Sequence, residues 1–262
     1  MAVLHFVYNM EINYEKMADR CYFTIKCIPK EDARQHLLCM DILILPECNY
    51  SYGEDSFGNR QVYGCVEEAH NKFVFKVSGD VQIIQTDYEE EECKSRTGMY
   101  CFPYGKCIPG QGILNYYSSL VFTDCNNNYD TCVYIMNKLY QDFSYVPEST
   151  NVETTAEEAW NLGSGVCQDY AHIYISLLRL AGIPARYVCG LIIGEGESHA
   201  WAEALCNGKW TGFDPANNCL VIDDYIKSGD GRDAKDCAIN RGIMWGGGRQ
   251  SQKVSVIVEK ND

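Results

Sequence analysis

Several features that would assign the chain to familiar classes are missing from its 262 residues. No apolar run approaches the roughly 20 residues of a membrane-spanning helix. Only 22 residues are lysine or arginine against 36 acidic ones, and the net charge of −14 argues against nucleic acid or an anionic membrane as a partner. The first eight residues lack the basic start and cleavage pattern of a secretory signal. We therefore expect a cytoplasmic protein with one or two domains.

The 15 cysteines are numerous, but their spacing suggests neither a disulfide scaffold nor a metal site. Disulfide scaffolds are typical of small secreted chains. No C-x-x-C pair occurs, and Cys101 and Cys107 are too loosely spaced to argue for zinc. A calcium loop with oxygen ligands is missing as well. We expect reduced thiols that fill apolar space, and no metal or other cofactor.

One cysteine, Cys167, occupies a position that favours a reactive thiolate. Cys167 follows two glycines, and the apolar residues after it recur with the spacing of an amphipathic helix that ends near Gly182. Cys167 then lies in the first helical turn, where unpaired amides and the helix dipole favour an anion and hence a thiolate. Its backbone N–H would also be available to an oxyanion. The alternative is a structural cysteine in the core.

A histidine and a carboxylate are predicted to meet on a β-hairpin. The Asn-Gly pair at 207–208 signals a two-residue turn between two apolar strands. In that register Trp201 faces Asp214, and His199 becomes a diagonal neighbour of Asp214 on the same side of the sheet. Asp214 would orient the imidazole, with Glu203 as the fallback carboxylate. Together with Cys167, these residues are the parts of a Cys-His-Asp nucleophilic site.

The rest of the chain divides into a β-rich part and a mixed part. Short strands between turns over 4–84 are typical of a small β-sandwich. An acidic run at 87–92 and a Gly/Pro-rich segment then precede several expected helices and antiparallel strands, which indicate an α+β domain. We assign residues 1–92 to an N-terminal β-sandwich, 93–111 to a connector, and 112–262, with its C-terminal strands, to the core.

Several stretches taken together resemble the transglutaminase-like superfamily, in particular bacterial transglutaminase-like proteins described as candidate cysteine proteases. The resemblance implies a papain-like core in which a helix bears the nucleophile Cys167 and an antiparallel sheet bears the base His199 and the orienting acid Asp214. The short spacings, 32 residues from cysteine to histidine and 15 from histidine to aspartate, resemble the compact microbial and peptide-N-glycanase-like branches. The matching stretches are 155–159, 165–171, 182–188, 199–203 and 213–215, with 55–59, 231–236 and 246–250 outside the core.

The residues and the resemblance predict a thiol enzyme that attacks amide or peptide bonds and passes through an acyl-thioester. A cysteine protease or amidase acting on a peptide or protein is the favoured interpretation. The alternatives are a protein-glutamine transamidase, a peptide-N-glycanase-like amidase and a catalytically silent protein-binding module. Residues 194–198 form either a mobile flap or a plain surface loop, and the oligomeric state stays open. Candidate oxyanion or pocket residues are Gln168, Trp160 and Trp201.

Overall fold

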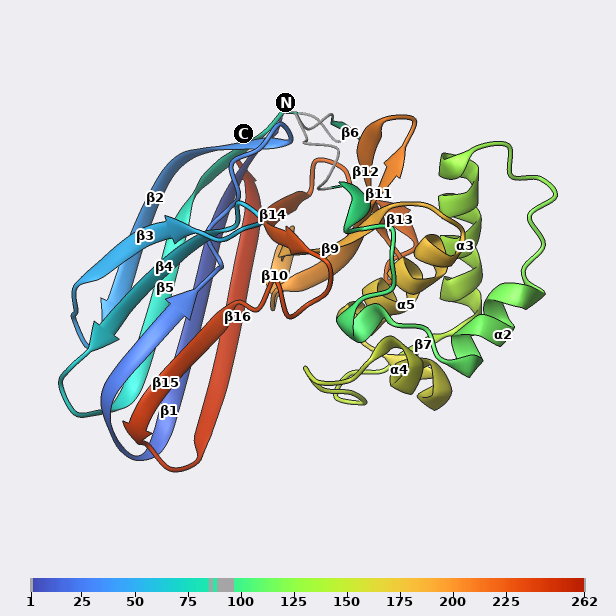
Figure 1. Cartoon of the computed structure of the whole chain (residues 1–262). Helices are drawn as coiled ribbons and strands as arrows, with labels where there is room; N and C mark the ends of the chain where they lie inside the picture. Colours follow the sequence, from blue (N-terminus) through green and yellow to red (C-terminus); the bar gives the residue numbers. More distant parts are fainter. Residues whose placement is uncertain (1, 85–86, 89–96, 262) are drawn as a thin grey trace.

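The computed structural model describes residues 2–84, 87–88 and 97–261. An all-β part and a part that combines helices with a second sheet lie side by side (Figure 1). The order of elements is mostly β up to residue 88 and then mixed, which confirms the predicted α+β class. In the described ranges, no helix is both long and apolar enough to cross a membrane.

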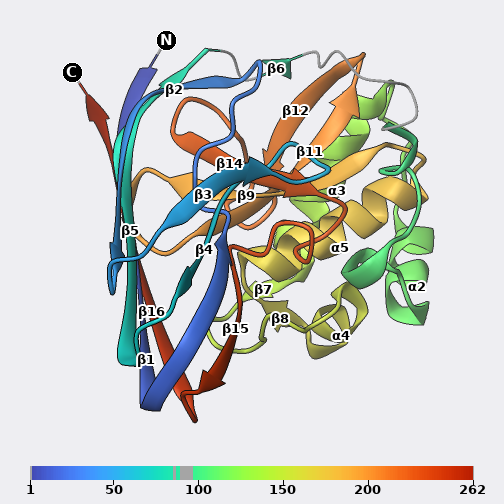
Figure 2. The same ribbon diagram turned by 60° about the vertical axis from the view of Figure 1, so that its left-hand side comes forward.

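A single eight-stranded sheet builds the all-β part. Its longest strand, β1 (Ala2–Ile25), pairs through its first half with β5 (His70–Ile83) and through its second half with β4 (Arg60–Val66). Between these halves the sheet folds over, so that two layers enclose an apolar core (Figure 2). The alternating burial along β1 follows from this arrangement, because every second side chain points between the layers. The outer strands are β2 (Gln35–Leu45) on β5 and β3 (Tyr50–Glu54) on β4.

The C-terminal strands belong to this sheet, which corrects their assignment to the core. β15 (Asn240–Gly246) pairs with the second half of β1, and β16 (Gln250–Asn261) pairs with the first half. The segment before His199 also joins, because β10 (Gly194–Gly196) pairs with β16 and is neither a flap nor a plain loop. The apolar pattern of a strand shows which face is buried but not which strand lies beside it, so the sequence did not reveal these partners.

The second sheet has the order β13-β12-β11-β9-β14, and helices cover one of its faces (Figure 1). Its central hairpin joins β11 (His199–Cys206) to β12 (Lys209–Asp214) in the predicted register, in which Cys206 pairs with Lys209. Asn207 and Gly208 both have positive φ, as the tight turn requires. The other strands are β9 (Ala185–Ile192), β13 (Cys219–Leu220) and β14 (Tyr225–Gly231), with β6 (Asp87–Tyr88) on β12. The rest of the acidic run, 89–92, lies outside the described residues.

The central helix of the core is α5 (Cys167–Leu180), which packs on β11 and β9 mainly through apolar side chains, and its buried Arg179 donates hydrogen bonds to the Ala185 carbonyl of β9. Thr155 caps α4 (Ala156–Leu162) in a capping box with Glu158. The remaining elements of this part are η1 (Gly105–Cys107), α2 (Gln111–Ser119), α3 (Asn128–Asp142), β7 (Ser144–Tyr145) and β8 (Ser164–Gly165).

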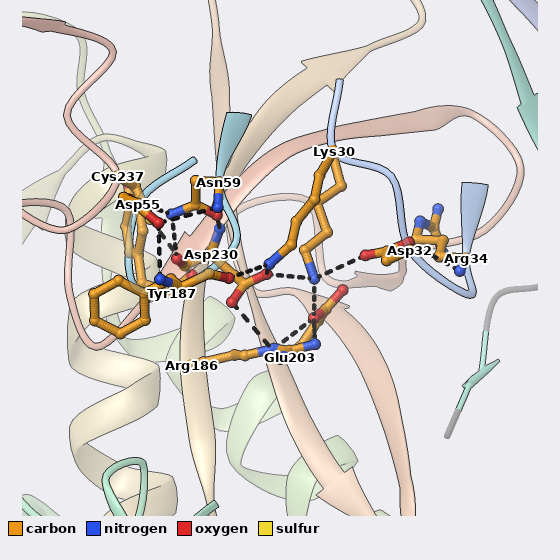
Figure 3. A network of polar contacts seen from close by, with 12 residues as sticks. Lys30, Asp32, Arg34, Asp55, Asn59, Arg186, Tyr187, Glu203, Asp230 and Cys237 are labelled. Atoms are coloured by element: carbon orange, nitrogen blue, oxygen red, sulfur yellow. Dashed lines mark hydrogen bonds and ion pairs between the residues drawn. The ribbon is translucent and has the colours of Figure 1, made fainter. Parts of the chain in front are cut away.

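Buried charged residues join the two parts of the molecule (Figure 3). Asp230 of β14 accepts hydrogen bonds from Lys30 at 2.5 Å, and its carboxylate lies 2.9 Å from the amine of Lys227. Asn59 donates its side-chain amide to the carbonyl of Asp230 and accepts from its N–H. The 55–59 stretch therefore helps to attach the all-β part to the core, together with Lys30.

Candidate active site

The local sequence places Cys167 at the start of α5. Val166 is the N-cap, and the carboxylate of Asp169 accepts a hydrogen bond from the Val166 N–H at 2.8 Å and one from the Thr150 hydroxyl at 2.5 Å. Gly165 makes this packing possible, because a Cβ there would lie 2.6 Å from the Asp169 side chain. Cys167 thus lies in the first helical turn, as predicted, with its side chain partly exposed.

The hairpin brings His199 and Asp214 into direct contact. The Nε2 atom of His199 lies 2.7 Å from Oδ2 of Asp214. The imidazole and the thiol of Cys167 line the same cavity, and the interaction of the ring with the thiol helps to raise the pKa of His199. The structure therefore brings together the three residues that the sequence indicated, with a hydrogen bond between imidazole and carboxylate and the thiol at the same cavity wall.

Asp214 is completely buried and held from several directions. Its Oδ1 accepts the backbone N–H groups of Ala216 and Asn217 at 3.0 and 3.1 Å. Its Oδ2 accepts the Asn217 side-chain amide at 2.8 Å and the Tyr225 hydroxyl at 2.9 Å, in addition to His199. Burial by itself would raise the pKa of Asp214, but these donors outweigh it and hold the pKa below its ordinary value. The carboxylate is therefore ionised and fixed in orientation.

The contact with Asp214 also changes the pKa of His199. Burial favours the neutral ring, yet the hydrogen bonds to Asp214 and Cys167 and the charge of Asp214 raise the pKa of His199 from 6.5 to about 10. The ring is therefore an imidazolium at neutral pH, which is the partner that a thiolate requires.

The raised pKa of His199 predicts a pH-dependent contribution to stability. Because the folded-state pKa is about 10 and the ordinary value is 6.5, protonated His199 stabilises the folded state fully below pH 6.5, and this contribution is lost as the pH rises towards 10. We expect the difference in unfolding free energy between wild type and His199→Gln to shrink across that window in urea titrations. A difference that stays constant with pH would contradict the assignment.

A cavity of about 660 Å³ opens beside Cys167 and His199. Its lining comes from both parts of the molecule, with Gln168 and Ser198 from the core and Gln252 and Val254 from β16. The charged residues of the lining are Lys106, Glu153, Glu197, Lys235 and Arg241.

Of the three further candidates, only Gln168 lies at the cavity; neither tryptophan is among the described residues that line it. Trp160 packs in the core, with its ring centroid 4.2 Å from that of Tyr116. Trp201 is completely buried behind His199, where it meets Tyr225 edge to face at 5.4 Å between centroids. Both tryptophans were candidate oxyanion or pocket residues, and the structure places them in the packing instead.

The fallback carboxylate Glu203 has other partners. It is buried, and its Oε2 accepts hydrogen bonds from Arg186 at 2.8 Å and from Lys227 at 2.9 Å. These cations hold its pKa below the ordinary value although burial would raise it. Glu203 therefore belongs to the buried charges that join the two parts and does not orient His199.

Tyr225 is the site residue that the sequence did not indicate. It begins β14, at the opposite edge of the sheet from β13, and still donates its hydroxyl to Asp214. A lone tyrosine directly after the polar turn residues 223–224 carries no motif signal for a catalytic site, so only the folded sheet could identify it.

Two family models match the chain. Residues 4–82 match the bacterial transglutaminase-like N-terminal region, and residues 117–215 match the transglutaminase-like superfamily core. The second range contains all three candidate catalytic residues, Cys167, His199 and Asp214.

Similar proteins are known in mycobacteria. An uncharacterised protein of Mycobacterium leprae is 39% identical over 125 residues, which are 44% of this chain and 44% of that protein. An uncharacterised protein of Mycobacterium tuberculosis is 35% identical over 127 residues, 42% of this chain and 40% of that protein. The match therefore spans less than half the length of these curated relatives.

The fold has a solved counterpart over its whole length. The structure described as a cysteine protease candidate from Cytophaga hutchinsonii superimposes with a TM-score of 0.84, covers 100% of this chain and 92% of that chain, and is 23% identical. This likeness establishes the arrangement of both parts. Residues 117–215 belong to the transglutaminase-like superfamily, and residues 4–82 match the N-terminal region of its bacterial branch.

Proposed function

We propose that the protein is a cysteine hydrolase that cleaves amide or peptide bonds, with Cys167 as nucleophile, His199 as acid and base, and Asp214 as the orienting carboxylate. The observation that carries this proposal is the imidazole of His199, which is hydrogen-bonded to a carboxylate with five donors and lies at the wall of the same cavity as the Cys167 thiol. The match of residues 117–215 to the transglutaminase-like superfamily core supports it.

The chemistry follows from these positions. The Cys167 thiolate attacks the carbonyl carbon of an amide, and the C–N bond breaks as His199 passes its proton to the leaving amine. This step leaves an acyl-thioester on Cys167. Water then attacks the thioester while neutral His199 takes up one of its protons. The C–S bond breaks, so that the thiolate and the imidazolium are restored and a carboxylic acid leaves, which ionises by releasing its proton to solvent. The amide of Cys167 and the side chain of Gln168 supply N–H groups for the oxyanion.

Access of water favours hydrolysis over transamidation. Transfer to an amine requires that water be excluded from the thioester. Here Cys167 is partly exposed, and the cavity lining includes the exposed residues Glu197 and Lys235. We propose a peptide or protein as the substrate, with nucleic acid and membranes outside its function. A cytoplasmic location stays a prediction.

Incubation with denatured casein and dansylcadaverine tests hydrolysis against transamidation. We expect new peptide N-termini to accumulate and little dansyl label to enter the protein, both detected by mass spectrometry. Cys167→Ala should lose all turnover. Dominant dansyl incorporation would make the protein a transamidase, and no turnover together with an ordinary thiol at Cys167 would favour the binding-module alternative.

A further inference from the structure

Strand β16 has one edge that is only partly covered. Along 250–261 it pairs with β1 on one side. On its other side β10 covers only Val256, Ile257 and Val258. In the described part of the chain, no strand pairs with that side of residues 250–255, and no hydrogen bond of another element reaches their backbone there.

This uncovered edge leads into the candidate active site. Gln252 and Val254, which lie on it, line the same cavity as Cys167 and His199. The covering strand β10 ends at Gly196, and Glu197 and Ser198 then follow the cavity wall to His199. The edge that β10 leaves free therefore borders the space in front of the thiol.

The uncovered edge is suited to a reversible strand partner. Unpaired N–H and C=O groups at a sheet edge bind an extended chain by main-chain hydrogen bonds. β10 demonstrates that this edge accepts a strand, since three residues of the chain itself already pair there. Residues 250–253 are exposed and polar, with Lys253 among them, and such residues keep an empty edge soluble.

We propose that an extended segment of a polypeptide substrate adds as a strand to residues 250–255 of β16, continues the pairing that β10 begins, and thereby reaches Cys167. This inference rests on the proposed function and specifies its substrate. Recognition through the backbone selects unfolded segments or tails of about five or six residues, and it discriminates weakly between side chains. Small amides and glutamine side chains on folded surfaces would bind poorly.

Two vinyl sulfone probes with the same reactive group test the inference on the intact protein. One carries a single acetylated alanine, and the other carries six alternating alanine and serine residues. We expect the long probe to label Cys167 on the order of 10- to 100-fold faster, because several main-chain hydrogen bonds add to its affinity. N-methylation of alternate amides should remove this advantage for one set of positions and spare the other, since only every second N–H faces the neighbouring strand.

Single prolines along the edge locate the contact. Five variants each carry one proline on the edge: Ser251→Pro, Gln252→Pro, Lys253→Pro, Val254→Pro and Ser255→Pro. A proline at a position whose N–H faces outward should keep the wild-type melting temperature but abolish the faster labelling by the long probe. Prolines at the alternating positions should break the ladder to β1 and destabilise the fold. Ser251→Ala and Ser255→Ala are the matched controls and should keep the advantage, because recognition is by backbone.

Iodoacetamide, which needs no docking edge, separates this inference from the proposed function. Equal labelling by both vinyl sulfones, with rapid iodoacetamide labelling of Cys167, would overturn strand addition and leave the hydrolase intact. Slow iodoacetamide labelling would overturn both. If sedimentation shows a dimer that the outward-facing prolines dissociate, the edge binds a second copy of the chain and the inference is wrong.

Discussion

Iodoacetamide at pH 6 is expected to alkylate Cys167 at least about 100 times faster in the wild-type protein than in His199→Ala. The thiolate is the reactive form, and an ordinary free thiol is less than about 1% ionised at that pH. In the wild type the imidazolium of His199, whose pKa is raised to about 10, lines the same cavity as the sulfur and stabilises its negative charge. Removal of the ring leaves only the start of α5 to do so.

Mass spectrometry of each alkylated cysteine measures this rate against pH. The exposed Cys39 in the same sample is the internal control, and its rate should not change with the substitution at His199. Asp214→Asn should reduce the rate less than His199→Ala, because the imidazole remains but loses the charge that favours its protonated form. Labelling of Cys167 that follows Cys39 in all three proteins would overturn the nucleophile assignment.

Loss of the Asp230 carboxylate is expected to destabilise the protein by about 3–5 kcal/mol, the usual effect of leaving a buried charge uncompensated. Asp230 is buried with Lys30 at 2.5 Å, Lys227 at 2.9 Å and Arg186 at 3.6 Å. Burial would raise its pKa, but these three cations hold the pKa far below its ordinary value. In Asp230→Ala, Glu203 and Asp32 remain as the carboxylates near three buried cations.

Urea unfolding at pH 7 measures this loss. The matched control is Lys72→Ala, which breaks the exposed ion pair with Glu11 at 2.7 Å and should leave the unfolding free energy nearly unchanged. The 2.7 Å separation in the control lies between the 2.5 and 2.9 Å distances from Asp230 to Lys30 and Lys227, so a different outcome would not come from the length of the pair. A loss in Asp230→Ala no larger than in the control would show that the buried network does not hold the two parts together.

The sequence by itself determined the features that depend on neighbouring residues. Two glycines, Cys167 and a one-faced apolar pattern specified where α5 begins, because a helix start depends on residues within one turn. The Asn-Gly pair specified the register of β11 and β12, because a two-residue turn allows one pairing. From these two local rules the contact between His199 and Asp214 could be predicted before the fold was known.

Only the tertiary structure decided which distant segments meet. Lys30 and Asp230 are 200 residues apart in the sequence, and the strands β15 and β16 return to pair with β1 at the opposite end of the chain. The contact of the Tyr225 hydroxyl with Asp214 and that of Lys227 with Glu203 depend on another long-range pairing, that of β14 with β9. Alternation of polar and apolar residues indicates that one face of a strand is buried, and a charged residue indicates that a partner is needed. Neither pattern indicates which strand or which residue the partner is, because long-range pairing depends on the fit of the whole core.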